Sequence, residues 1–153
     1  MGSNLSSGLG GPREHLDVAV QWIAELGRVV AVSSYLATAA EIYTDQPDFL
    51  NAALLLETEL GPLELMHALL GIEGVMGRVR TGIPPKGPRV IDLDLIFFDA
   101  VVMKSDELTL PHPGVAERGF VLRPLAEIAG DWVEPMSGRT VAALLAELEA
   151  TPR

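Results

Sequence analysis

One stretch of the chain combines an alternating apolar pattern with two acids: Gly87-Pro88-Arg89-Val90-Ile91-Asp92-Leu93-Asp94-Leu95-Ile96-Phe97-Phe98. Successive side chains of a β-strand point to opposite faces, so apolar residues at every second position predict one buried face. That face would carry Ile91, Leu93, Leu95 and Phe97. We therefore predict a buried strand over residues 90–98, with Asp92 and Asp94 next to each other on the opposite face.

The two acids allow two interpretations. Residues two apart on a strand have Cα atoms roughly 6.5–7 Å apart, so the carboxylates of Asp92 and Asp94 can converge on one or two metal ions. Two acids among apolar neighbours repel each other and lose hydration unless a positive charge lies between them. Alternatively, this face is simply solvated and the acids only contribute to solubility. The stretch alone favours neither interpretation.

The composition is typical of one globular domain. The chain has 153 residues, of which 48% are hydrophobic and 21% are charged, and this length is sufficient for a substantial core. No apolar run approaches the length of a membrane span, and the first residues lack the features of a signal peptide. The chain contains no cysteine, which excludes disulfides and thiolate chemistry. We expect a single domain over residues 1–153, located in the cytoplasm and not in a membrane.

The distribution of charge points to a small anionic ligand. A formal net charge of -10 argues against binding to nucleic acids or membranes, because both are anionic. No Lys or Arg occurs between Arg28 and Arg78, and cations then gather just before the two acids. They are Arg78, Arg80, Lys86 and Arg89, followed later by Arg118 and Arg123. Cations beside an acidic pair predict a compact polyanion bound with a divalent metal, and a nucleoside triphosphate is the obvious candidate.

Periodicity and turn residues predict an α+β fold. The expected helices cover residues 13–26, 62–76, 120–129 and 140–149, with Pro62 at a helix start and Thr140 as an N-cap. The expected strands cover residues 29–35, 49–58 and 90–98, with a hairpin partner for the last at 101–103. Residues 38–48 and 81–88 are predicted loops, and the second is rich enough in Gly and Pro to form a lid.

The order helix, strand, strand, helix, strand is typical of a mainly antiparallel sheet with helices on its faces. It is similar to a ferredoxin-like sandwich without its opening strand. His15 falls in the first predicted helix, where we expect it at the surface.

Short motifs occur along the whole chain in a distinctive order. They are Gly2-Ser3-Asn4-Leu5, Ser33-Ser34-Tyr35, Gln46-Pro47-Asp48-Phe49-Leu50-Asn51-Ala52, Ile72-Glu73, Gly77-Arg78-Val79-Arg80, Gly87-Pro88-Arg89, Ile91-Asp92-Leu93-Asp94-Leu95, Leu110-Pro111-His112-Pro113, Phe120-Val121-Leu122 and Pro124-Leu125-Ala126-Glu127-Ile128. Each motif alone is weak evidence, and a lone Asp-x-Asp is common. Together they resemble the 6-hydroxymethyl-7,8-dihydropterin pyrophosphokinase family of folate biosynthesis.

The resemblance implies transfer of a diphosphate from ATP to the hydroxymethyl group of the reduced pterin, with release of AMP. It implies two Mg²⁺ ions held by Asp92 and Asp94, which would bridge the triphosphate, and a further role for Asp94 in orienting or deprotonating the attacking hydroxyl. Arg78 and Arg89 match family arginines that grip the phosphates, with Arg80 alongside. These four residues are the expected catalytic set: Arg78, Arg89, Asp92 and Asp94.

The resemblance also assigns residues to the two substrates. Thr109, His112 and Arg118 match positions of the ATP site. Phe49 and Phe120 match the aromatic pair that sandwiches the pterin ring. For each of these side chains, ordinary packing in a turn or in the core is the alternative.

Two more positions match the pterin pocket. Asn51 matches the amide that reads the hydrogen-bonding edge of the pterin, because an amide offers a donor and an acceptor together. Thr38 lies in the loop that lines the same pocket.

Three departures from the family pattern affect the expectations. The chain begins at the Gly-Ser-Asn-Leu turn, where the family has an apolar strand before it, so we expect a truncated chain or a misplaced start. Ala39-Ala40 replace a common Pro-Pro, which predicts a less rigid pterin loop. Lys86 stands where the lid often carries an aromatic residue, which predicts weaker lid closure and the same reaction.

Two alternatives to a Mg²⁺- and ATP-dependent pyrophosphokinase remain at this point. One is a ferredoxin-like binding module whose acids are merely a solvated strand face, and the other is an inactive family member that still binds pterin or nucleotide. In each case we expect a monomer that binds small molecules.

Overall fold

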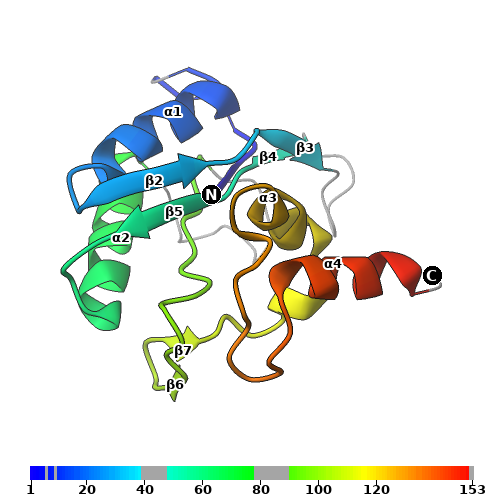
Figure 1. Ribbon diagram of the computed structural model, residues 1–153. Coiled ribbons are helices and arrows are strands. Elements are labelled where there is room, and N and C mark those ends of the chain that lie inside the picture. Colours follow the sequence, from blue (N-terminus) through cyan, green and yellow to red (C-terminus); the bar gives the residue numbers. More distant parts are fainter. Residues whose placement is uncertain (6, 9, 39–47, 78–89, 152–153) are drawn as a thin grey trace.

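The computed structural model describes residues 1–5, 7–8, 10–38, 48–77 and 90–151, and its architecture is α+β. Helices α1 and α2 lie together behind strands β2 and β5, whereas α3 and α4 form a second pair beside the strands (Figure 1). The elements are β1 (Gly2–Ser3), α1 (Pro12–Ile23), β2 (Arg28–Val32), β3 (Leu36–Thr38), β4 (Phe49–Asn51), β5 (Leu54–Glu57), α2 (Pro62–Val75), β6 (Met103–Lys104), β7 (Thr109–Leu110), the 3₁₀ turn η1 (Val115–Glu117), α3 (Gly119–Ala129) and α4 (Val141–Ala150).

Local signals at the helix ends account for the four helices, all of which the sequence predicted. Helix α2 begins with Pro62 at its first position, and the Glu64 carboxylate accepts a hydrogen bond of 3.0 Å from the Gly61 N–H. The predicted cap of α4 is also confirmed, because Thr140 Oγ1 accepts from the Ala143 N–H at 3.1 Å. Such caps satisfy N–H groups that have no partner within the helix.

Strands β2 to β5 follow one another as a bent antiparallel ribbon. β2 pairs with β5, and β3 pairs with β4. At the bend, Ser33 N donates to Ala53 O at 2.9 Å, and Ala53 N donates to Ser33 Oγ at 2.8 Å. A side chain there replaces a backbone acceptor, so the predicted strand 49–58 is divided into β4 and β5. The predicted strand 29–35 is confirmed only as far as Val32, and β3 begins after its predicted end.

The acidic segment, residues 90–98, differs from its prediction. It forms only an isolated antiparallel bridge, in which Gly2 N donates to Asp92 O at 2.9 Å and Asp92 N donates to Gly2 O at 2.8 Å. The predicted alternation is confirmed where this bridge lies, since Ile91 and Leu93 are buried while Asp94 is exposed. A regular strand through Phe98 is wrong, because the next backbone groups bond to other parts of the chain.

The predicted hairpin partner at 101–103 is also wrong. β6 pairs with β7 and not with the acidic segment, in the register Met103↔Leu110 and Lys104↔Thr109. This β6–β7 hairpin lies at the end of the molecule opposite β3 and β4 (Figure 1).

Two hydrophobic clusters meet along the acidic segment. Ile91 and Leu93 belong to the first cluster, with apolar residues of α1 and α2. Phe97 packs against the second cluster, between α3 and α4, and its ring stacks on Trp132 with 6.2 Å between centroids. The acidic segment therefore links the two helix pairs. Within the described residues, none of the helices has both the length and the apolar character needed to span a membrane.

His15 is a third correction, since its side chain is fully buried and not at the surface. Its Nδ1 lies 3.0 Å from Ser3 Oγ, and its Nε2 lies 2.6 Å from Ser7 Oγ. A neutral imidazole has one donor and one acceptor nitrogen, and hydroxyls can complement both. Desolvation lowers the pKa of His15 below its ordinary value, so the fold favours the neutral ring.

We predict that His15→Gln lowers the free energy of unfolding by about 1–3 kcal/mol at pH 8, because the contacts of the imidazole with both serine hydroxyls are lost. A lowered pKa in the folded state stabilises the protein above the unfolded value, and this contribution disappears as the pH falls below about 6.5. The difference between wild type and variant should therefore shrink in acid. Urea unfolding at several pH values measures it, and a difference independent of pH would contradict this role of His15.

A second prediction concerns Glu73, a buried residue of α2 whose Oε2 accepts a hydrogen bond of 2.7 Å from the Leu93 N–H. Glu73→Leu leaves that buried N–H without an acceptor, which costs about 1–3 kcal/mol. Glu73→Gln keeps an acceptor oxygen and should lose less stability. Equal losses in urea unfolding would show that this hydrogen bond contributes little.

Candidate active site

One cavity of about 720 Å³ brings together every predicted site residue that lies within the described part of the chain. They are Thr38, Phe49, Asn51, Asp92, Asp94, Thr109, His112, Arg118 and Phe120. The predicted Arg78, Arg80 and Arg89, together with Ala39, Ala40 and Lys86, lie outside the described residues. The cavity has an aromatic and amide end, a charged middle, and an apolar end.

The charged middle contains the acid pair. Asp92 is half-buried and its backbone is fixed by Gly2, whereas Asp94 is exposed on the cavity wall. Loss of hydration raises the pKa of Asp94 above its ordinary value, and the charge of Asp92 raises this pKa further. Both effects disfavour two bare carboxylates, and a cation between them would offset both.

The donor set fits Mg²⁺, which prefers carboxylate oxygens and commonly takes its remaining ligands from phosphates and water. Among the described residues, no group of three or more His, Cys, Asp or Glu is arranged to hold a metal. Two carboxylates occupy only some of the six ligand positions of Mg²⁺.

His112 and Arg118 stand on the same wall as the acids. His112 N donates to Ile96 O at 2.9 Å, which places the ring after the β6–β7 hairpin and beside the acidic segment. Its Nδ1 is buried without a hydrogen-bond partner, which is unusual for a polar atom in a protein. This imidazole and the Arg118 guanidinium provide the polar contacts that a phosphate group requires.

The aromatic and amide end is built on β3, β4 and the start of α3. Asn51 Nδ2 donates to Thr38 Oγ1 at 2.6 Å, so each side chain fixes the other. Gly2 makes this arrangement possible, because a Cβ at that position would lie only 2.9 Å from Asn51 Oδ1. The amide is buried and held at one orientation on the cavity wall.

Phe49 and Phe120 are both half-buried and line this end of the cavity. The Arg118 guanidinium lies 6.0 Å from the centroid of the Phe120 ring, within the range of a cation–π contact. Arg118 therefore connects the charged middle with the aromatic end.

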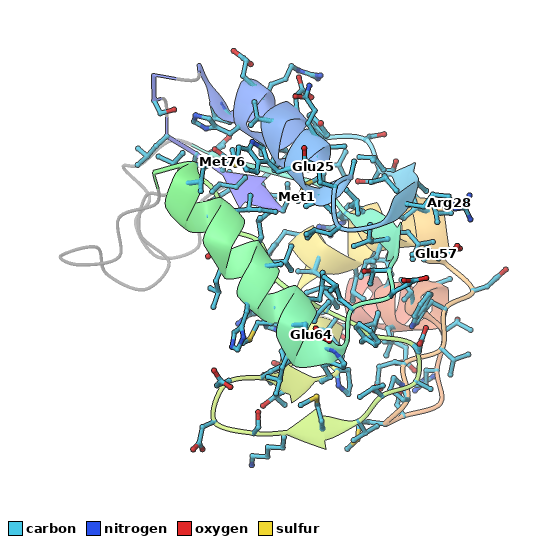
Figure 2. The ribbon with its side chains drawn as sticks, turned by 90° about the vertical axis from the view of Figure 1, so that its left-hand side faces the viewer. Met1, Glu25, Arg28, Glu57, Glu64 and Met76 are labelled. Carbon is cyan, nitrogen blue, oxygen red and sulfur yellow. The ribbon has the colours of Figure 1, made fainter. Side chains whose placement is uncertain are left out.

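The apolar end was not predicted from the sequence. Leu65, Met66, Leu69 and Leu70 of α2 form one wall, and residues 105–109 of the β6–β7 hairpin face them across the cavity. The side chains of α2 and of the hairpin are seen from the side in Figure 2, with Glu64 and Met76 marking the two ends of the helix. Only the folded hairpin creates this second wall.

Glu73 was not among the site residues predicted from the sequence. It lines the cavity, and through Leu93 it fixes the backbone between the two acids. One signal was available, because Glu73 follows Leu65, Leu69 and Ile72 on the buried stripe of α2. A charged residue on an apolar stripe requires a partner, and here the partner is a backbone N–H.

Comparison with known proteins matches most of the chain to one family. The model of the 7,8-dihydro-6-hydroxymethylpterin-pyrophosphokinase family matches residues 1–130. The chain is 42% identical over 134 residues to 2-amino-4-hydroxy-6-hydroxymethyldihydropteridine pyrophosphokinase of Synechocystis sp., covering 84% of this chain and 67% of the relative. It is 44% identical over 147 residues to the protein of the same name from Methylorubrum extorquens, covering 95% of this chain and 90% of the relative.

A third relative is much longer. The chain is 37% identical over 147 residues to the folic acid synthesis protein fol1 of Schizosaccharomyces pombe, covering 95% of this chain and 20% of that protein. The match therefore covers only one part of that longer protein. The family model matches most of this chain, and the first two relatives are matched over two thirds or more of their own length. The chain therefore belongs to the 7,8-dihydro-6-hydroxymethylpterin-pyrophosphokinase family.

Proposed function

We propose that the protein transfers a diphosphate from ATP to 6-hydroxymethyl-7,8-dihydropterin in folate synthesis, giving the pterin diphosphate and AMP. Family membership supports the reaction. One observation carries its assignment to this site: a single cavity holds an aromatic and amide end, an acid pair and an apolar end in series. A flat heterocycle, a triphosphate and a purine base are the three groups that such a cavity would accommodate together.

Asp92 and Asp94 would hold up to two Mg²⁺ ions. When bound, Mg²⁺ neutralises phosphate charge and aligns the triphosphate. The backbone bonds of Asp92 to Gly2 and of Leu93 to Glu73 hold the two carboxylates in place before substrate binds. Fixed charges of this kind need little reorganisation during the reaction, which is how most phosphoryl-transfer sites lower the barrier.

The remaining polar side chains in the charged middle of the cavity contact the phosphates. His112 and Arg118 bind phosphate oxygens, and Arg78, Arg80 and Arg89 complete this set from outside the described residues. Asp94, exposed on the cavity wall, is positioned to orient the hydroxymethyl group of the pterin for attack or to accept its proton. Transfer then depends mainly on position and charge.

The pterin occupies the aromatic and amide end. Phe49 and Phe120 provide flat apolar contacts for its ring, and Asn51 provides a donor and an acceptor for its edge. The hydrogen bond to Thr38 restricts the orientation of that amide. ATP extends the other way, with Thr109 near the nucleoside and the base between α2 and the β6–β7 hairpin.

The arrangement of helices and strands also supports a proposal about the fold. Helices packed on antiparallel strands support a ferredoxin-like sandwich, in which the bridge between Gly2 and Asp92 places the acidic segment beside β1. A single domain, a monomeric state and a cytoplasmic location remain predictions from the sequence.

The acid pair gives the most direct test by mutation. Asp92→Asn and Asp94→Asn should each lower AMP formation by about a hundredfold or more, because each removes a charged metal ligand. The assay contains Mg²⁺, ATP and 6-hydroxymethyl-7,8-dihydropterin, with EDTA as the metal-free control.

Asp99→Asn is the matched control, because Asp99 is an exposed acid of the same region that does not line the cavity. Its turnover should stay near that of wild type. Wild-type turnover in Asp92→Asn or Asp94→Asn would show that the metal site is elsewhere, and a folded wild type that releases no AMP would refute the proposed reaction.

Phe120→Ala should raise the KM for the pterin roughly tenfold or more, because one flat face of the pocket is lost. The KM for ATP should change much less. Phe120→Tyr keeps an aromatic ring and should restore most of the pterin affinity. An unchanged pterin KM in Phe120→Ala would indicate that Phe120 only packs in the core.

A further inference from the structure

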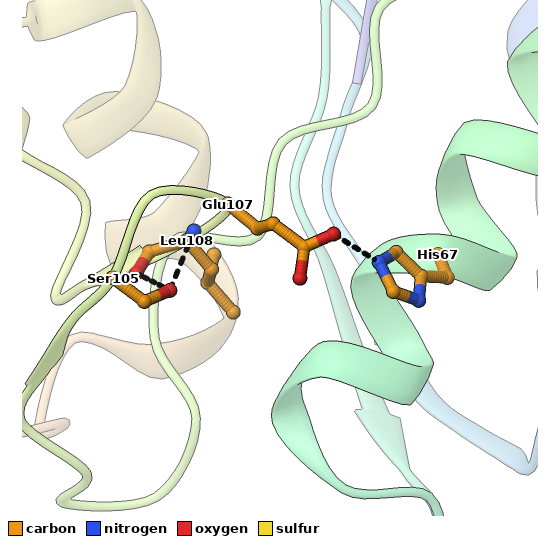
Figure 3. A network of polar contacts seen from close by, with 4 residues as sticks. All are labelled: His67, Ser105, Glu107 and Leu108. Atoms are coloured by element: carbon orange, nitrogen blue, oxygen red, sulfur yellow. Dashed lines mark hydrogen bonds and ion pairs between the residues drawn. The ribbon is translucent and has the colours of Figure 1, made fainter.

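A polar contact bridges the two walls of the apolar end of the cavity. His67 of α2 and Glu107 of the β6–β7 hairpin lie 2.9 Å apart, measured from Nε2 to Oε1 (Figure 3). An ionised carboxylate can only accept, so the imidazole is the donor in this pair. The contact connects two segments that are 40 residues apart in the chain.

The position of the pair is specific to the cavity. Met66, adjacent to His67, lines the cavity from the helix, and Glu107 itself lines it from the hairpin. The pair thus lies at the rim, with the apolar wall of α2 directly behind it. About half of each side chain surface remains exposed, at 54% for His67 and 57% for Glu107.

Hydrogen bonds within the β6–β7 hairpin fix the backbone around Glu107. Ser105 Oγ donates to Leu108 O and accepts from the Leu108 N–H, both at 3.1 Å (Figure 3). Leu108 is buried and lines the cavity. Residues 105–108 therefore form one tight turn, so a displacement of Glu107 also displaces the backbone that leads into Thr109.

The apolar faces alone leave the spacing between the walls loosely determined. Apolar contact is not directional, whereas the hydrogen bond between His67 and Glu107 has a defined length and direction. The pair therefore limits how far the hairpin can move away from α2.

We propose that His67 and Glu107 act as a positioning pair that sets the width of the apolar end of the cavity and thereby the affinity for the nucleotide. The inference rests on the proposed function, in which the base of ATP lies between α2 and the hairpin. Neither side chain takes part in the chemistry, so the rate of transfer and the pterin end should not depend on the pair.

The expected effect is small and can be measured. Exposed pairs of this kind contribute little, so losing the contact should weaken nucleotide binding about two- to fivefold. Binding of α,β-methylene-ATP with Mg²⁺ by isothermal titration calorimetry gives the affinity directly. Steady-state AMP formation gives the KM for ATP, the KM for the pterin and kcat.

The variants are His67→Ala, Glu107→Ala and the double variant. Each single variant should weaken α,β-methylene-ATP binding and raise the KM for ATP by the same factor, and the double variant should be no worse than either. Glu107→Gln keeps an acceptor oxygen and should restore most of the affinity. The pterin KM and kcat should stay unchanged in all of them.

The pair between Arg28 and Glu57 is a matched control. Both residues are labelled in Figure 2. The pair has the same length of 2.9 Å and is exposed, and neither residue lines the cavity. Arg28→Ala and Glu57→Ala should leave nucleotide affinity at the wild-type value. A loss of affinity in these controls equal to that in His67→Ala would mean that general destabilisation is being measured, and it would overturn the proposal.

The remaining outcomes separate this proposal from the proposed function. Unchanged affinity in both single variants, or effects that add in the double variant, would overturn the positioning role while wild type still forms AMP. A wild type that binds α,β-methylene-ATP but forms no AMP would refute only the proposed reaction. The calorimetric comparison of the variants would still test the positioning role of His67 and Glu107. A folded wild type that does not bind the analogue would overturn both.

Discussion

Two backbone hydrogen bonds between Gly2 and Asp92 determine where the acids of this protein lie. Gly2 also pairs with Asn51 of β4, so a single residue joins the segment that carries the acids to the strand that carries the amide. A Cβ at this position would approach Asn51 Oδ1 to 2.9 Å, so any larger residue would displace the amide. Glu73 completes the arrangement through Leu93. Substrate groups that differ as much as a triphosphate and a pterin can therefore meet at fixed distances.

These contacts also explain how the site can concentrate negative charge. Loss of hydration and the charge of Asp92 raise the pKa of Asp94, whereas the charges of the N-terminal ammonium and of Arg118 act in the opposite direction. The fold maintains the pair because its backbone is fixed and its neighbours Ile91 and Leu93 are buried. A cation bound by the two carboxylates would offset both the loss of hydration and their mutual repulsion.

Features coded by neighbouring residues could be predicted from the sequence, and features that depend on distant contacts could not. Pro62 and Thr140 mark helix starts whose signals are local. In contrast, His15 is buried with its ring hydrogen-bonded to Ser3 of β1 and to Ser7. Likewise, β6 pairs with β7 because the chain turns at Ser105. The family resemblance identified nine residues that line one cavity. It did not predict the apolar end of this cavity, because that end forms only when α2 and the β6–β7 hairpin come together.

The central claim is that this one cavity binds both substrates around the acid pair. A crystal structure of the protein with Mg²⁺, α,β-methylene-ATP and 6-hydroxymethyl-7,8-dihydropterin would test it most directly. We expect metal density on the carboxylates of Asp92 and Asp94, the pterin between Phe49 and Phe120, and the adenine between α2 and the β6–β7 hairpin. Metal bound away from both acids, or a pterin outside the Phe49 and Phe120 end, would contradict the account.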